Sequence, residues 1–213
     1  MASYPLRSLS LLAAAVLALA PSARAAEAPE DIRFKVEKLL EGMPQPMHLE
    51  FGPDGRIWLN EYTGALKVYD PKTKRVTLVA EIEAFKQQEN GFLAFALDPK
   101  FAQNGWIYLI YSPLGFDGQH LSRFTIKDDK LVAGSEKLIL KYEEQRLQCC
   151  HHGATLKFGP DGCLYFSTGD NTSPFGDSQG FAPLDQRPGK EAFDGQRTSA
   201  NTNTLVGKVN RIR

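Results

Sequence analysis

Two adjacent histidines, His151 and His152, can meet a ligand if a loop carries them to the rim of a sheet. An imidazole with an ordinary pKa of about 6.5 is often neutral near physiological pH, so it can accept a proton as a general base. A carboxylate and an amide, Asp170 and Asn171, close the same stretch. Two alternatives stay open: His152 is a packed or surface histidine, and Asp170 only stabilises a turn.

The elements that must position these residues form a strand, a tight turn and a second strand. The stretch from Gln148 to Asn171 reads QCCHHGATLKFGPDGCLYFSTGDN. Its FGPDG segment has the proline, aspartate and glycine of a tight turn, and residues 164–168 alternate as a strand does. We therefore expect the histidines in a loop one short strand before the turn, where a sheet rim can meet a ligand.

The same turn sequence occurs twice, which indicates a repeat. FGPDG begins at Phe51 and again at Phe158, and an Asp-Pro turn lies between them. The turn prolines, Pro53, Pro99 and Pro160, are 46 and 61 residues apart (99 − 53 and 160 − 99). Units of this length with about four short strands are typical of β-propeller blades. A β-sandwich is the competing all-β interpretation, but it does not predict a recurring turn.

The chain divides into a signal peptide at residues 1–25, a leader with a first strand at 26–46, and a partial propeller at 47–213. Alternation from Ile32 to Leu40 predicts that first strand, and Glu83 to Gln88 carries a weak helical pattern. A long loop rich in proline and glycine at 172–203 is of the kind that is functional or disordered. The 188 residues after the signal peptide (213 − 25) hold about three blades. We expect an open propeller, either a fragment or a chain that pairs its open edge.

The N-terminus has the features of an export signal. Arg7 precedes an apolar run, and Ala23-Arg24-Ala25 matches a signal-peptidase site. We predict cleavage near Ala25/Ala26 and a secreted or periplasmic product. The apolar run is too short for a stable membrane span, and we expect no later span. The 25 basic and 25 acidic residues form no basic run, so nucleic-acid binding has little support.

The predicted export also affects the expected oxidation state of the three cysteines. In an oxidising compartment, Cys149 and Cys150 can join as a vicinal disulfide. The alternative is two reduced, buried side chains. Cys163 is left unpaired and is expected to pack along its strand.

Three segments together resemble one family. They are ENGFLAFALDPKFAQNGWIYLIYS, CCHHGATLKFGPDGCLYFSTGDN and NTNTLVGKVNRI. Their ordered set is similar to the glucose/sorbosone dehydrogenases, which are soluble sugar dehydrogenases that depend on pyrroloquinoline quinone (PQQ) and have a six-bladed propeller. FGPDG alone occurs in many propellers, whereas the set is specific. The resemblance runs from about Met47 to Arg213 and covers the N-terminal half of that propeller.

The resemblance implies roles for individual residues. His151 matches the family's catalytic base, which takes the proton of the sugar's anomeric hydroxyl while hydride passes to the quinone. Substrate- or cofactor-binding residues implied at the same rim are Glu89, Asn90, Asp170, Asn171 and His152. His48, at a comparable place in the first blade, is a weaker rim candidate.

The resemblance also implies PQQ and calcium, a sugar substrate and an external electron acceptor such as a cytochrome. Most PQQ and calcium ligands of the family lie in later blades, and no motif ties Arg187, Lys190 or Arg197 to those roles. Two other functions stay open. One is a noncatalytic propeller that binds carbohydrate or protein, and the other is a calcium-dependent hydrolase of the lactonase type.

Overall fold

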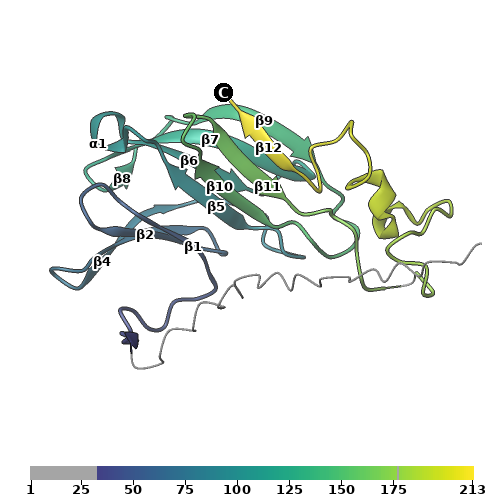
Figure 1. The fold of residues 1–213 in the computed structure, drawn as a ribbon, viewed down its shortest axis with the longest axis horizontal. Coiled ribbons are helices and arrows are strands. Elements are labelled where there is room, and N and C mark those ends of the chain that lie inside the picture. The colour runs from purple at the N-terminus through teal and green to yellow at the C-terminus, as the bar shows by residue number, and fades with distance from the viewer. Residues whose placement is uncertain (1–32, 177) are drawn as a thin grey trace, which may run out of the picture. The chain divides into compact units, whose positions relative to one another are not determined.

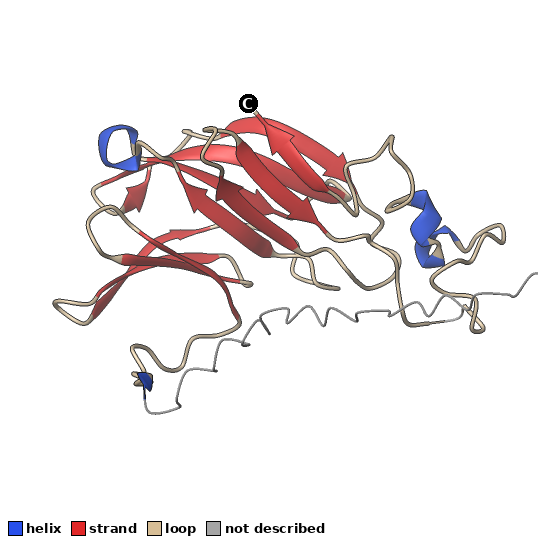
Figure 2. Ribbon diagram, viewed as in Figure 1, coloured by secondary structure: helices blue, strands red, loops and turns tan. Residues whose placement is uncertain are grey.

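The computed structural model describes residues 33–176 and 178–213. The chain separates into two compact units, and every strand found among the described residues lies in the second, residues 39–213. The predicted signal peptide lies outside the described residues. Figure 2 shows that the second unit is nearly all β. In the described part of the chain, no helix is long and apolar enough to cross a membrane.

Three antiparallel sheets follow one another along the chain (Figure 1). The first sheet is a four-stranded meander of β1 (Pro46–Phe51), β2 (Ile57–Glu61), β3 (Ala65–Asp70) and β4 (Arg75–Glu81). The second contains β5 (Phe92–Leu97), β6 (Trp106–Tyr111), β7 (Gly118–Lys127), β8 (Lys130–Leu131) and β9 (Lys137–Glu143), with β9 paired to β7. The third contains β10 (Ala154–Phe158), β11 (Leu164–Thr168) and β12 (Val209–Ile212).

Both FGPDG segments form the turn that the sequence predicts. Gly52 N donates to Arg56 O over 2.8 Å in the first, and Gly159 N donates to Cys163 O over 2.9 Å in the second. The closing glycines, Gly55 and Gly162, have φ values of 83° and 74°, which residues with a Cβ adopt at a cost. Each turn therefore joins the first two strands of its sheet in the same way.

The core consists of two apolar clusters, one between the first and second sheets and one between the second and third. Phe92 and Phe95 on β5 belong to the first cluster, and Leu93 and Ala94 on the same strand belong to the second. Both faces of β5 are therefore buried. The first strand of each sheet also contacts the first strand of the next, β1 with β5 and β5 with β10. Such a side-by-side series of sheets is the arrangement expected of successive propeller blades.

Two predicted elements, a strand near the N-terminus and a helical segment before β5, do not form. Residues 34–43 contain no strand, in contrast to the strand predicted over Ile32–Leu40, and Phe34 and Val36 are exposed. Alternation alone supplies no paired neighbour, and no strand of the described residues pairs with this segment. Glu83–Gln88 is not helical, and the short α1 (Phe101–Asn104) stands instead in the connection from β5 to β6.

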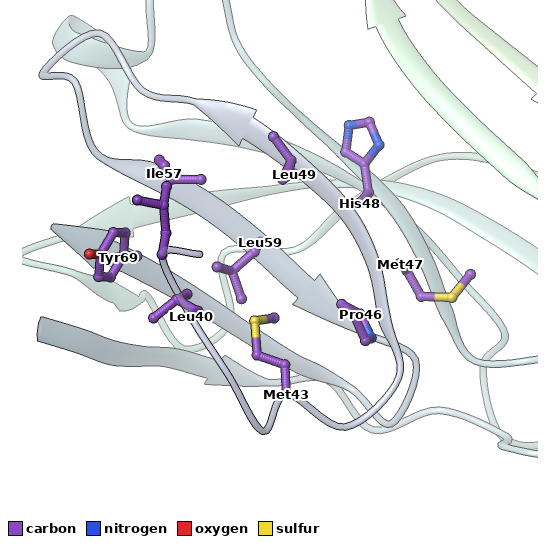
Figure 3. A pocket seen from close by; sticks show the side chains of 10 residues that line it. Leu40, Met43, Pro46, Met47, His48, Leu49, Ile57, Leu59 and Tyr69 are labelled. Carbon is purple, nitrogen blue, oxygen red and sulfur yellow. The ribbon is translucent and has the colours of Figure 1, made fainter. Parts of the chain in front are cut away.

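The segment before β1 packs along the first sheet. Leu40 and Met43 line an apolar hollow with Ile57 and Leu59 of β2 and Tyr69 of β3 (Figure 3). His48 also lines this hollow, whereas His151 and Asp170 do not.

The long connection from β11 to β12 contains two short 3-10 helices, η2 (Glu191–Phe193) and η3 (Gly195–Arg197). Phe193 is buried, and Leu184 forms an isolated bridge with Asp194. The described part of this loop is thus anchored without a strand ladder.

Candidate active site

Three loops at the ends of the second and third sheets bring the predicted residues together. The loop before β5 carries Glu89 and Asn90, the loop from β9 to β10 carries residues 149–152, and the loop after β11 carries Asp170 and Asn171. Hydrogen bonds join all three loops.

His151 and Asp170 form a hydrogen-bonded pair. His151 Nδ1 lies 2.8 Å from Asp170 Oδ1, and the side chains are 47% and 29% exposed. Asp170 Oδ1 also accepts from Thr172 N over 3.1 Å, which fixes the carboxylate. An ionised carboxylate can only accept, so the neutral imidazole carries its proton on Nδ1 and leaves Nε2 with a lone pair. This geometry suits a general base.

The backbone holds these two loops close together. Asn171 N donates to His151 O over 3.1 Å, and Gly169 N donates to Gly153 O over 2.9 Å. A Cβ built on Gly169 would lie 1.9 Å from His151 O, so only glycine fits there. The glycine of the TGDN turn therefore permits the approach that lets Asp170 reach the ring.

Glu89 binds the backbone of the same histidine. Its Oε2 accepts from His151 N over 2.6 Å, and both residues have positive φ values, 67° for Glu89 and 59° for His151. Glu89 is exposed beside this contact, whereas its neighbour Asn90 is buried. Asn90 therefore faces the interior, and its burial does not support the predicted contact with a ligand.

His152 and Asn171 are also fully buried. His152 Nδ1 lies 2.7 Å from Glu144 Oε2, and Asn171 exchanges hydrogen bonds with the backbone of Gln145 over 2.7 and 3.1 Å. Burial favours the alternative in which His152 is a packed histidine. Sequence reasoning missed Glu144, because a glutamate in the pair Glu143-Glu144 gives no sign of burial.

Cys149 and Cys150 are bonded to each other in the structure. Their sulfur atoms and the carboxylate of Glu89 lie within 4.8 Å of one another, a spacing that can hold a metal ion. Sulfur atoms in a disulfide are not thiolates, so this group is not a metal site while the bond is present. Cys163 is free and buried, as expected.

The other basic and histidine candidates lie at different places. Arg197 reaches the rim and donates from Nη2 to Asn171 O over 3.1 Å, and desolvation lowers its pKa. Arg187 instead binds Asp185 within the long loop. His48 lies on β1 with its ring 5.2 Å from that of Phe95, and burial lowers its pKa. His48 therefore does not join the His151 cluster.

The described residues do not form a complete PQQ and calcium site. Apart from the Glu89–Cys149–Cys150 group, no set of three histidine, cysteine or carboxylate ligands comes together among residues 33–176 and 178–213. PQQ is a polycarboxylate, so it needs several cationic partners, and Arg197 is a guanidinium that contacts the candidate rim. These residues do not fit either group by themselves.

The described residues thus form three antiparallel sheets side by side, with a histidine–carboxylate pair on the loops of the second and third. A model of the glucose/sorbosone dehydrogenase family matches residues 43–213. The chain belongs to this family.

Individual relatives agree with this assignment. Quinoprotein glucose dehydrogenase B of Acinetobacter calcoaceticus is 30% identical over 171 residues, which cover 76% of this chain and 35% of the relative. The PQQ-bound aldose sugar dehydrogenase of Streptomyces coelicolor superposes with a TM-score of 0.63 at 21% identity, covering 83% of this chain and 47% of the other. The apo soluble aldose sugar dehydrogenase of Escherichia coli gives a TM-score of 0.58 at 22% identity, covering 79% and 44%. The chain thus spans about a third of its curated relative and less than half of these solved structures.

Proposed function

We propose that this chain supplies the proton-accepting part of an exported, PQQ-dependent sugar dehydrogenase with a six-bladed propeller. The observation that carries the proposal is the 2.8 Å contact between His151 Nδ1 and Asp170 Oδ1 on an exposed rim. Family membership and the quinoprotein name of the Acinetobacter relative support the reaction class.

In this proposal His151 Nε2 accepts the proton of a sugar hydroxyl. Asp170 holds the ring in the tautomer with the Nδ1 proton, and its charge stabilises the imidazolium that forms. In the same proposal Glu89, which is exposed beside His151, accepts a hydrogen bond from another sugar hydroxyl. In this proposal three buried residues support the rim from inside the protein and do not contact the substrate. They are Asn90, Asn171 and His152.

The described residues do not form a binding site for the electron acceptor. Family membership implies PQQ with calcium, and an external acceptor such as a cytochrome would then reoxidise it. Their binding residues are proposed to lie outside the described set, so we assign this chain no step on the quinone.

The test measures aldose-dependent reduction of an artificial electron acceptor with added PQQ and calcium. It uses the 213-residue polypeptide and, in parallel, the longest polypeptide that its gene encodes. We expect His151→Ala to lower kcat by about 10²- to 10⁴-fold, the usual contribution of a general base. The matched control is His48→Ala, at a histidine outside the cluster. An active protein whose rate is the same with His151→Ala would reject His151 as the base.

The same assay separates the alternatives. A noncatalytic module would bind sugar in calorimetry without reducing the acceptor in either polypeptide. A hydrolase of the lactonase type would open a lactone with calcium and without quinone.

A further inference from the structure

A buried ionisable pair lies directly behind the proposed base. The side chains of His152 and Glu144 have no exposed surface, and 2.7 Å separates His152 Nδ1 from Glu144 Oε2. Burying a carboxylate costs several kcal/mol unless donors compensate, and a buried pair is weak evidence for stability. Packing alone therefore does not explain why this buried pair is present.

The pair belongs to a network that starts at the loop before β5. Gly91 N donates to Ser112 Oγ over 2.9 Å, and Ser112 Oγ donates to Gln119 Oε1 over 2.8 Å. Gln119 Nε2 then donates to Asn90 Oδ1 over 3.2 Å and to Glu144 Oε2 over 2.7 Å. Glu144 Oε2 thus accepts from Gln119 and from His152, one donor on each side.

The loop before β5 is connected to the loop of residues 149–152 in two ways. Glu89, next to Asn90, binds His151 N over 2.6 Å, while Asn90 connects through Gln119 and Glu144 to His152. Two neighbouring residues of one loop are therefore tied to two neighbouring residues of the other. This double attachment restricts the rotation of the His151 backbone, whose φ of 59° is otherwise unfavourable for a residue with a Cβ.

We propose that His152 and Glu144 are positioning residues of the candidate site, which hold the His151 loop so that its ring meets Asp170. The role requires a donor at the Nδ1 position of His152 and an acceptor at Glu144. It requires no contact of either residue with the substrate. The expected effect on catalysis rests on the proposed function. The positioning of the His151 ring does not depend on that function.

Four variants separate positioning from packing. His152→Asn keeps a side-chain donor near the Nδ1 position, whereas His152→Leu removes it. Glu144→Gln keeps an acceptor and removes the buried charge, so loss of the His151 signal in this variant would overturn the inference even where His152→Leu fails to fold. His48→Leu is the matched control, because His48 packs on Phe95 outside the network.

The first readout is the ¹⁵N and ¹H NMR signal of the His151 imidazole at one pH. We expect the signal of an Nδ1 proton bonded to a carboxylate in the wild type, His152→Asn, Glu144→Gln and His48→Leu, and its loss in His152→Leu. The second readout is kinetic. Misplacement of a reacting group by about 1 Å can cost about 10²-fold in rate, so His152→Leu should lower kcat by that order with KM unchanged.

The outcomes are distinct. A His151 signal that persists in His152→Leu overturns the inference, and so does an equal loss in His152→Asn and His152→Leu. If His151→Ala leaves the activity intact, the proposed function fails, while the NMR comparison still decides whether His152 and Glu144 position that ring.

Discussion

The Oδ1 atom of Asp170 lies 2.8 Å from the Nδ1 atom of His151, although 19 residues separate them in the chain. Gly169 makes this approach possible, because a Cβ there would collide with His151 O. The contact assigns opposite tasks to the two ring nitrogens, with Nδ1 donating to the carboxylate and Nε2 left to accept a proton.

The first prediction concerns the charge of Asp170. We expect Asp170→Asn to fold and to lower kcat by about 10²- to 10⁴-fold, because a neutral amide does not stabilise the imidazolium and can also hold the other tautomer. The check is kcat with PQQ, calcium and an aldose, set beside thermal unfolding. Asp185→Asn, in the long loop, controls for the loss of one carboxylate. A kcat equal to wild type would show that Asp170 only stabilises its turn.

The β class and the repeating turn could be predicted from the sequence because local patterns determine them. Alternation, FGPDG and the family motifs all describe neighbouring residues. Burial depends on what the fold packs above a residue, so sequence alone could not separate exposed His151 from buried His152. Glu144 was missed for the same reason, since its partner Gln119 lies 25 residues away. The strand predicted over Ile32–Leu40 failed because alternation does not supply a pairing partner.

The second prediction concerns the cysteines. If Cys149 and Cys150 form a disulfide in solution, the unreduced, unfolded protein will show about one reactive thiol, from Cys163, and the reduced protein about three. Thiol titration in denaturant measures this difference, and the mass of the intact protein should rise by about 2 Da on reduction. Cys163→Ser is the control and should show no thiol before reduction. Three thiols in the unreduced wild type would support the alternative of two buried, reduced side chains.

The third prediction uses the pKa of Asp161 in the second FGPDG turn. The backbone N–H of Cys163, with further hydrogen bonds from Arg211 and Tyr165, lowers the pKa of Asp161 to about 2. The unfolded value is about 3.9, so the unfolded chain binds more protons between these values. The contribution of Asp161 to stability is therefore present above about pH 4 and is lost as the pH falls towards 2.

Urea unfolding at several pH values between 5 and 2 tests this sign. The free energy of unfolding should fall less steeply with acid in Asp161→Asn than in the wild type. Tyr165→Phe, which removes one of the hydrogen bonds to Asp161, should lie between them. Identical pH dependence in all three proteins would contradict the assignment.

The last prediction compares two phenylalanines on neighbouring first strands. Phe95 on β5 has no exposed surface and packs between sheets, whereas Phe51 at the end of β1 is 69% exposed. Phe95→Ala should lower the free energy of unfolding by about 3–5 kcal/mol, because it removes a buried ring and leaves a cavity. Phe51→Ala should change it by about 0.5 kcal/mol or less, as surface substitutions do. Urea titration of both variants measures the difference. A comparable loss at Phe51 would show that this face of β1 is covered in solution, so that the first sheet has a partner beyond the described residues.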